Sequence, residues 1–517
     1  MTQNERASMP IWKKCILLVL SLIVFSIQLA IVFFTISTFF DQGNKETTSI
    51  VGIVNIIIYV IAMCFVLHII HRPIPPNFKI TWSVLILIFP LPFMLLYLLN
   101  FISLYFSKKK QVKAFKNISV VDNKGDLEML EEESPTGACL AKTIQAGTIA
   151  PVYKNHTYKF FNDGAPKHED LLMELKTATK YILLEYFIMN SGTVMDEVMD
   201  ILEEKGKAGV KIYLLYDDIG SKGGFSKKML NRLLSIPNCE VATFEPIGFN
   251  LSLIVNYRDH RKIAVIDGRV AYCGGDNLSD EYVHRKDRFG FWRDNCGKFE
   301  GEIVDSFIEL FKENWYMSTR NTFEVEPYEH KKYDTEGFVQ AFGDGPINNA
   351  DPAYDLFCSL IQAAKNYIFI STPYFIIDDI ILHELCLKAK SGVNVIILMP
   401  GIPDKPMAYY MGRERYGEII KAGCKVYEFT KGFNHAKNVI VDDKFAFIGT
   451  VNFDYRSLFL HYECGALVVN DPEILTMKED FIETINESRE VSYDIWKKRP
   501  FYQKVIAFIL NIFQTMF

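Results

Sequence analysis

The chain has 517 residues, and its 56 Lys and Arg against 62 Asp and Glu give a net charge of −6. This balance excludes a globally basic nucleic-acid-binding protein. Because 49% of the residues are hydrophobic and 23% are charged, intrinsic disorder is excluded over most of the chain. At about 150 residues per domain, the length predicts roughly three units.

Three uncharged, apolar stretches occupy residues 15–40, 49–70 and 80–107. A helix needs about 20 apolar residues to cross a bilayer. We therefore expect a membrane region over residues 1–110, with transmembrane helices at these stretches. The second stretch also fits a buried or re-entrant helix, and Pro90 and Pro92 interrupt the third, so the number of spans, two or three, stays open.

A basic cluster follows the third stretch and consists of Lys108, Lys109, Lys110, Lys113 and Lys116. Basic flanks favour the cytoplasmic side of a membrane, and they attract anionic lipid headgroups. We therefore predict a multi-pass protein of the cell membrane with its body on the cytoplasmic side. The basic residues on the two sides nearly balance in number, so the side of the N-terminus stays open.

An acidic tract over residues 122–133 predicts a solvated linker that spans 111–150. The ten cysteines include no C-x-x-C pair. This spacing favours reduced thiols in a cytoplasmic body over a disulfide framework or a zinc site. We accordingly expect neither a metal nor another cofactor.

The rest of the chain contains a duplication. Matching helix-then-strand segments occur at 170–189 and 355–377 and at 203–218 and 387–401, and matching short strands occur at 239–244 and 424–429. Helices that alternate with strands of buried type are typical of α/β layers around a mixed sheet. We predict one repeat over residues 151–330 and a second over 331–495, followed by a terminal segment over 496–517.

One motif occurs at the same place in both repeats. The first copy contains His260, Lys262, Asp267, Gly274, Gly275 and Asn277, and the second contains His435, Lys437, Asp442, Gly449, Thr450 and Asn452. The spacing H-x-K-x4-D-x6-G-x-x-N is the same in both copies. A single match is weak evidence for a short pattern, but two matches inside a duplicated unit are strong evidence.

The residues between Lys and Asp, IAVI and NVIV, indicate a strand in each motif. Residues two apart on a strand share a face, so the His and Lys of each motif project together. Asp267 and Asp442 fall on the opposite face, where we expect them to anchor the motif structurally. The small residue after the next strand permits close backbone approach, and Asn277 and Asn452 offer amide donors to an anion.

Two such half-sites around one pocket suit a negatively charged phosphoryl group. One imidazole attacks phosphorus to form a phosphohistidine and the other protonates the leaving alcohol, while the lysines and asparagines stabilise the transition state. Which histidine is the nucleophile stays open. A nucleophilic histidine needs an acceptor for its other nitrogen. Glu463 is a candidate for one histidine, and Asp294, or failing that Glu300, for the other.

The paired motifs resemble those of the phospholipase D superfamily, and the stretches 89–101, 274–282, 290–295 and 371–378 resemble bacterial cardiolipin synthases. The resemblance implies two tandem phospholipase D-like α/β/α repeats in a pseudo-twofold body, preceded by transmembrane helices. It also implies phosphatidyl transfer between two phosphatidylglycerol molecules, which gives cardiolipin and glycerol. The implied catalytic set is His260, Lys262, Asp267, His435, Lys437 and Asp442, and the family pattern favours the histidine of the N-terminal motif as nucleophile.

Other functions fit parts of the same pattern. A phospholipase D-type hydrolase, or another phosphatidyltransferase of the superfamily, uses the same residues and differs in whether water reaches the intermediate. A nuclease is disfavoured by the apolar stretches and by the lack of a basic, aromatic groove. A non-enzymatic membrane scaffold is disfavoured because both His–Lys pairs are intact. We therefore expect phosphatidylglycerol and anionic membrane lipids as partners, and no nucleic acid.

The terminal segment has two interpretations. It is mainly apolar after Lys497, Lys498 and Arg499. Such a segment forms either an interfacial helix at the lipid surface or a helix that caps the core.

Overall fold

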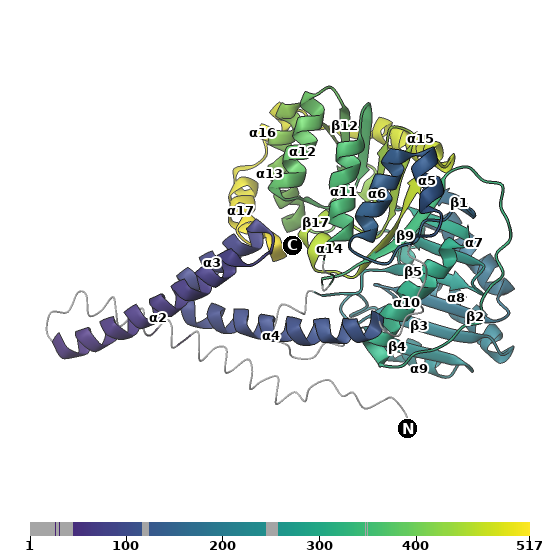
Figure 1. Ribbon diagram of the computed structural model, residues 1–517, viewed down its shortest axis with the longest axis horizontal. Coiled ribbons are helices and arrows are strands. Elements are labelled where there is room, and N and C mark those ends of the chain that lie inside the picture. The colour runs from purple at the N-terminus through teal and green to yellow at the C-terminus, as the bar shows by residue number, and fades with distance from the viewer. Residues whose placement is uncertain are drawn as a thin grey trace. The chain divides into compact units, whose positions relative to one another are not determined.

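A computed structural model describes residues 26, 30, 45–115, 124–244, 257–346, 348 and 350–516 (Figure 1). The described residues fall into two compact units. The N-terminal unit contains the described residues up to Lys109 together with Ile512–Met516. The α/β body contains the described residues from Lys110 to Asn511, and both predicted repeats lie within it.

The N-terminal unit is built from α2 (Lys45–His71), α3 (Pro76–Ile88) and most of α4 (Pro90–Phe115). Within α2, Gly52–His71 is, among the described residues, the one helix long and apolar enough to cross a membrane. It coincides with the second predicted span. The first predicted span, over 15–40, lies outside the described residues apart from Ser26 and Ala30, which are both helical.

The third predicted span, over 80–107, is not a single helix. The chain leaves the helical conformation at Phe89, where φ is −131° and ψ is 78°, and α4 begins at Pro90. Proline lacks a backbone N–H, and its ring forces the preceding residue out of the helical region. The stretch is therefore divided between two shorter apolar helices, and multiple N-terminal spans are not confirmed.

The first sheet of the α/β body has seven strands in the order β1-β8-β6-β5-β2-β3-β4. Strands β2, β3 and β4 are parallel, and β5 runs antiparallel to β2. The elements of this half are β1 (His156–Phe161), α7 (Gly164–Thr177), β2 (Tyr181–Tyr186), α8 (Thr193–Lys207), β3 (Lys211–Asp217), α9 (Lys227–Leu234), β4 (Cys239–Phe244), β5 (Lys262–Ile266), β6 (Val270–Gly274), η2 (Asp280–Val283), β7 (Phe291–Arg293), β8 (Cys296–Gly301) and α10 (Ile303–Thr319).

The second sheet has eight strands in the order β19-β13-β12-β10-β15-β16-β18-β9. Strands β10, β12 and β13 are parallel, and β15 runs antiparallel to β10. The elements of this half are β9 (Phe338–Asp344), α11 (Pro352–Ala363), β10 (Tyr367–Ser371), β11 (Phe375–Ile376), α12 (Asp379–Lys390), β12 (Asn394–Pro400), α13 (Pro406–Ala422), β13 (Lys425–Phe429), β14 (Gly432–Asn434), β15 (Asn438–Val441), β16 (Phe445–Gly449), β17 (Phe453–Asp454), α14 (Tyr455–Phe459), β18 (Glu463–Val469), α15 (Glu473–Asn486), β19 (Ser488–Glu490), α16 (Tyr493–Lys497) and α17 (Phe501–Asn511), with η3 (Gln514–Met516) after them.

The two sheets share a strand order. The run β8-β6-β5-β2-β3-β4 in the first corresponds to β18-β16-β15-β10-β12-β13 in the second. In the first core, apolar side chains of α7, α8 and α9 pack on the sheet, and those of α11, α12 and α13 do so in the second. The predicted mixed α/β fold is confirmed.

Part of the predicted linker 111–150 is packed structure. Helices α5 (Leu127–Glu133) and α6 (Pro135–Gln145) lie within it, and α6 runs beside α11 (Figure 1). Leu130, Leu140 and Ile144 are buried in the core of the second half. The interpretation of this tract as solvated is wrong for residues 127–145, because its few apolar residues are spaced so that they gather on the inner faces of two short helices.

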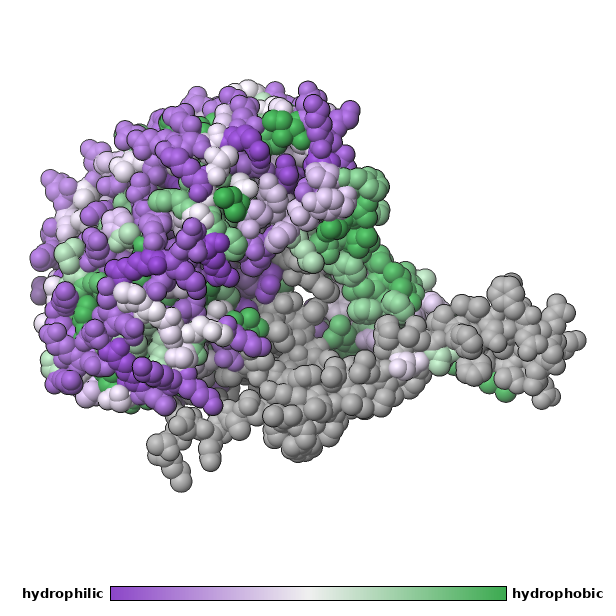
Figure 2. Space-filling view, turned by 180° about the vertical axis from the view of Figure 1, so that it is seen from behind, coloured by the Kyte–Doolittle hydropathy of each residue, from purple (hydrophilic) through white to green (hydrophobic). Residues whose placement is uncertain are grey.

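The last helix of the α/β body, α17, exposes several large apolar side chains close together. Figure 2 shows that the surface of the α/β body is mainly hydrophilic, with smaller hydrophobic patches. In α17, Phe501 is 79% and Phe508 is 74% exposed. Only Ala507 of this helix is buried, so α17 covers little of the core.

Candidate active site

The two His–Lys pairs stand at the start of equivalent strands, His260 and Lys262 at β5 and His435 and Lys437 at β15. Each ammonium donates to the carbonyl oxygen of its own histidine, Lys262 Nζ to His260 at 2.6 Å and Lys437 Nζ to His435. All four residues are between 1% and 7% exposed. The bond to the backbone fixes each cation beside its imidazole, and burial shields both groups from bulk water.

Backbone bonds between the two halves hold each histidine in place. Strand β14 pairs in parallel with β7, and the His435 amide donates to the Arg293 carbonyl at 2.7 Å. The counterpart is a bridge between Asp259 and Tyr462, where the His260 amide donates to the Tyr462 carbonyl at 2.8 Å. Each motif is therefore attached to the opposite half of the body.

The same contacts between the two halves bring a carboxylate to each imidazole. His260 Nδ1 lies 2.9 Å from both Oε1 and Oε2 of Glu463, and His435 Nδ1 lies 2.6 Å from Oδ2 of Asp294. Since a carboxylate only accepts, Nδ1 carries the hydrogen and the lone pair is left on Nε2. The structure thus pairs Glu463 with His260 and Asp294 with His435. Glu300, the reserve candidate, instead accepts from the Tyr333 hydroxyl at 2.8 Å.

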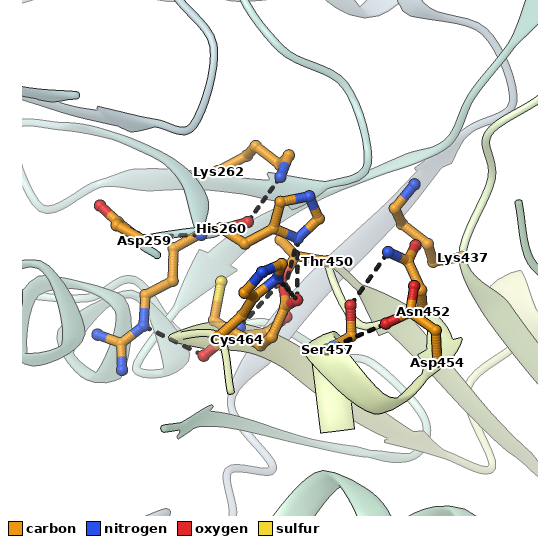
Figure 3. Close-up of polar contacts among 12 residues, drawn as sticks. Asp259, His260, Lys262, Lys437, Thr450, Asn452, Asp454, Ser457 and Cys464 are labelled. Carbon is orange, nitrogen blue, oxygen red and sulfur yellow. Dashed lines mark hydrogen bonds and ion pairs between the residues drawn. The ribbon is translucent and has the colours of Figure 1, made fainter. Parts of the chain in front are cut away.

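The two half-sites face a common space. A Cβ built on Gly275 of the first motif is 3.2 Å from Lys437 Cδ and 2.1 Å from Asp294 Oδ1 of the second half-site. Glycine at this position permits the close approach, because any side chain displaces the carboxylate. Figure 3 shows His260, Lys262 and Lys437 grouped together. The pairs therefore converge although they are far apart in the sequence.

Burial and mutual repulsion shift the proton affinities of this cluster. Burial lowers the pKa of both His260 and His435 well below the ordinary value, and Lys262 and Lys437 lower both further. Burial also lowers the pKa of Lys437 to about 7 and raises the pKa of Asp294 to about 6. Adding an anion to this cluster opposes the shifts of the histidines and lysines, so the site favours a negatively charged ligand.

Both motif asparagines are fixed by hydroxyl groups. Asn277 Nδ2 donates to the Tyr282 hydroxyl at 2.8 Å and its Oδ1 accepts from the Ile188 amide at 2.9 Å. Asn452 Nδ2 donates to Ser457 Oγ at 3.0 Å. An amide nitrogen carries two hydrogens, so each asparagine keeps a second one in a defined orientation.

The motif aspartates lie at the other end of the strands. Asp267 accepts from the backbone amides of residues 179, 180 and 181 at 2.8–2.9 Å. Asp442 accepts from those of residues 365, 366 and 367 at 2.7–2.9 Å. Both have positive φ, 54° and 53°, as the first residue of a tight hairpin turn requires. Their contacts are those of structural anchors.

Two further side chains lie beside His260 and Glu463: Thr450, which the motif spacing had already included, and His461, which the sequence reasoning missed. Thr450 Oγ1 donates to a Glu463 oxygen. His461 is 9% exposed, and its ring lies 5.3 Å from that of His260. His461 precedes Glu463 by two residues, and this strand spacing was the one available indication that the two share a face.

His260, His461 and Glu463 place potential metal ligands within 4.8 Å of one another. The charges around them oppose a cation. Arg456 and Lys262 lower the pKa of His461 after burial itself, and the same positive field repels a metal ion. The surroundings therefore fit an anion better than a metal.

Comparison with known proteins agrees with this geometry. The sequence matches the family described as "Cardiolipin synthase, PLD-like domain" over residues 171–315 and 357–485. The chain belongs to this family. It is 33% identical over 470 residues to a cardiolipin synthase of a Geobacillus species, which covers 88% of this chain and 92% of the relative. It is 35% identical over 462 residues to an uncharacterised protein of Streptococcus mutans, which covers 86% of this chain and 98% of the relative.

The family match spans both half-sites, since each matched segment of this cardiolipin synthase family member contains one H-x-K motif. The crystal structure of phosphatidylserine synthase from Haemophilus influenzae has a TM-score of 0.56 at 15% identity, and it covers 74% of this chain and 100% of that one. At this identity the likeness shows the fold alone, which is the mixed α/β phospholipase D-like fold. The predicted family resemblance is confirmed, and the chain is a phosphatidyltransferase enzyme.

Proposed function

We propose that the chain is a cardiolipin synthase that transfers a phosphatidyl group from one phosphatidylglycerol to another through His260 and His435. The observation that carries this proposal is the crossed arrangement of the half-sites. Each imidazole is oriented by a carboxylate from the other half of the body and has an ammonium bonded to its own carbonyl. Two nucleophile–acid groups of this kind on one phosphorus support double displacement.

The first step forms a covalent lipid intermediate. The Nε2 lone pair of one histidine attacks the phosphorus of the donor phosphatidylglycerol. A P–N bond forms, and the bond from phosphorus to the headgroup oxygen breaks. The leaving oxygen takes a proton from the other histidine, and glycerol departs as a neutral alcohol.

The second step reverses the roles with a new alcohol. A free hydroxyl of a second phosphatidylglycerol gives its proton to the histidine that was left neutral, and its oxygen attacks phosphorus. The new P–O bond forms as the P–N bond breaks. Cardiolipin leaves, and both histidines return to their starting protonation states, so atoms and charge balance over the cycle.

The buried cations stabilise charge on the phosphoryl oxygens. Lys262 and Lys437 each offer an ammonium group, and Asn277 and Asn452 each offer their second amide hydrogen. The acid must hold a proton although burial lowers its pKa. The bound lipid phosphate supplies the opposite charge that raises this pKa, so acid and substrate assemble together.

The substrate also bears on location. Phospholipids reside in a bilayer, and α2 contains the candidate span Gly52–His71. We place the chain in the cell membrane through this helix. The α/β body then lies on the cytoplasmic side, because Arg72 and Lys79 closely follow the span and basic flanks favour that side.

A product assay tests the proposed reaction. The purified full chain is incubated in detergent micelles with phosphatidylglycerol labelled in its headgroup glycerol. We expect cardiolipin and free labelled glycerol in equal amounts. Phosphatidic acid with glycerol and no cardiolipin contradicts the proposal and identifies the hydrolase, and the double variant His260→Ala/His435→Ala is the inactive control.

A further inference from the structure

Helix α17 presents a continuous apolar face. Phe501, Val505, Phe508 and Ile509 are 79%, 38%, 74% and 50% exposed. Their spacing of four, three and one residues places them on one side of a helix. Isolated exposed apolar residues are ordinary on a soluble surface, whereas a contiguous group of this size marks an interaction surface.

Contacts at Ala507, at the edge of the apolar face and just before the helix fix α17 to the α/β body. Ala507 is fully buried, and the Tyr502 ring lies 6.2 Å from that of Tyr410 on α13. Just before the helix, Arg499 forms an ion pair with Glu414 and its guanidinium lies 4.2 Å above the Trp496 ring. A helix of 11 residues is marginally stable alone. These contacts hold it in one orientation, so its apolar face is directed away from the body.

Basic residues border this apolar face. Lys497 and Lys498 are exposed just before α17, and Lys504 Nζ donates to the Lys497 carbonyl at 2.9 Å. An apolar stripe beside lysines is the composition of a helix that lies at an anionic membrane surface. Phosphatidylglycerol, the substrate under the proposed function, is itself an anionic lipid.

The chain that follows α17 joins the N-terminal unit. Residues Ile512–Met516 belong to that unit, where Thr81 Oγ1 of α3 donates to the Ile512 carbonyl at 3.0 Å and Thr515 Oγ1 donates to Thr81 Oγ1 at 3.3 Å. This unit also contains the candidate membrane span. Helix α17 is thus continuous in sequence with the part of the chain that fits a bilayer.

We propose that α17 lies in the plane of an anionic bilayer, with Phe501 and Phe508 among the acyl chains and the lysines at the headgroups. With 11 residues at about 1.5 Å per residue, it is too short to cross a hydrocarbon core of about 30 Å. In this position it holds the α/β body at the surface from which lipid substrate enters. The helix placement stands on its own observations, and only its effect on turnover rests on the proposed function.

Paired rate measurements on the full chain test the placement. The double variant Phe501→Ser/Phe508→Ser is compared with wild type in phosphatidylglycerol bilayers at limiting lipid and in excess-detergent micelles. We expect the bilayer rate to fall about tenfold or more, with the micelle rate within about twofold of wild type. Met173→Ser is the matched control, because Met173 on α7 is an apolar residue with 60% exposure and is expected to change neither rate.

Photo-crosslinking provides a readout that does not depend on turnover. A benzophenone amino acid placed at position 508 is expected to label phosphatidylglycerol in bilayers, and one placed at position 173 is not. Unchanged bilayer rates in the double variant, or equal losses in bilayers and micelles, overturn the proposal. It is also overturned if position 508 crosslinks to a second copy of the chain instead of to lipid. A wild type that makes no cardiolipin in micelles contradicts the proposed function and leaves the crosslinking result interpretable.

Discussion

The two half-sites have the same motif spacing, but different side chains surround their histidines. Around His435, the rings of Tyr282, Trp292 and Phe433 lie 5.6, 5.5 and 5.5 Å from the imidazole. Around His260, the neighbouring rings are Phe187 at 4.9 Å and His461 at 5.3 Å. One imidazole is therefore enclosed by aromatic groups, and the other adjoins a second titratable ring.

Part of the difference arises at one pair of corresponding positions. Trp292 and His461 each precede the orienting carboxylate, Asp294 or Glu463, by two residues. An indole there excludes water, whereas an imidazole can accept or donate a proton. A duplicated motif thus supplies two similar reactive groups. We propose that the residues around each histidine determine which one is the nucleophile and which the acid.

The strongest test of this comparison removes one imidazole at a time. His260→Ala and His435→Ala are each expected to lower transfer by on the order of 10⁴-fold or more, because neither step proceeds with one reactive group. Only the variant that lacks the nucleophile is expected to lose the covalent lipid–enzyme adduct, measured by acid quench and mass spectrometry. Substantial transfer by either single variant contradicts a shared site.

The lysines come next in expected effect. Lys262→Ala and Lys437→Ala are expected to lose about 10²–10³ in kcat, the usual cost of removing an oxyanion donor. Because Lys262 also lowers the pKa of Lys437, Lys262→Ala is expected to raise the pKa of Lys437. Measurement of kcat against pH for both variants checks this. Near-normal rates in both variants show that the lysines do not stabilise the transition state.

The orienting carboxylates distinguish the two roles through pH. Asp294→Asn and Glu463→Gln each remove a negative charge from beside a histidine, which lowers the pKa of that histidine further, and each is expected to cost about 10²-fold. The histidine that acts as the acid must be protonated. The variant of the carboxylate beside it therefore loses activity at a lower pH than wild type on the alkaline side of the profile. The nucleophilic histidine must be neutral. The variant of the carboxylate beside it therefore stays active to a lower pH than wild type on the acidic side of the profile. Profiles of kcat/KM that move identically for both variants contradict a division of roles.

The smallest expected effect concerns the residue that follows the motif glycine. Gly275→Ala places a methyl group 2.1 Å from Asp294 Oδ1, so the carboxylate must move, and we expect about a tenfold loss in kcat. Thr450→Ser in the second motif retains the hydroxyl that bonds Glu463 and is the control, expected within about twofold of wild type. Equal rates for the two variants show that the close approach at Gly275 does not constrain the site.

The motif spacing predicted which residues meet, because the H-x-K pattern on a strand fixes a shared face and its duplication fixes two copies. It left the pairing of Glu463 and Asp294 with the histidines undetermined. That pairing depends on contacts between residues more than 140 positions apart, which no local pattern encodes. His461 was missed for the same reason, since its role depends on a neighbour in the opposite half.

Local signals misled in two places. Charge density suggested a solvated linker, yet Leu130 and Ile144 pack into the second core, because a few apolar residues on one helical face suffice for burial. Apolar length suggested a third span over 80–107, yet Pro90 ends α3 at Ile88. Hydropathy averages do not register the loss of one backbone hydrogen-bond donor.

The crossed carboxylates have a consequence for synthesis of the chain. When the first 330 residues have left the ribosome, His260 and Lys262 are present, but the group that aligns His260, Glu463, has not yet been translated. Asp294 is also present at this stage, but its partner His435 has not yet been translated. A polypeptide that ends before Glu463 therefore lacks the carboxylate that orients His260, so we expect phosphoryl transfer to begin only after the second half has been translated and has folded onto the first.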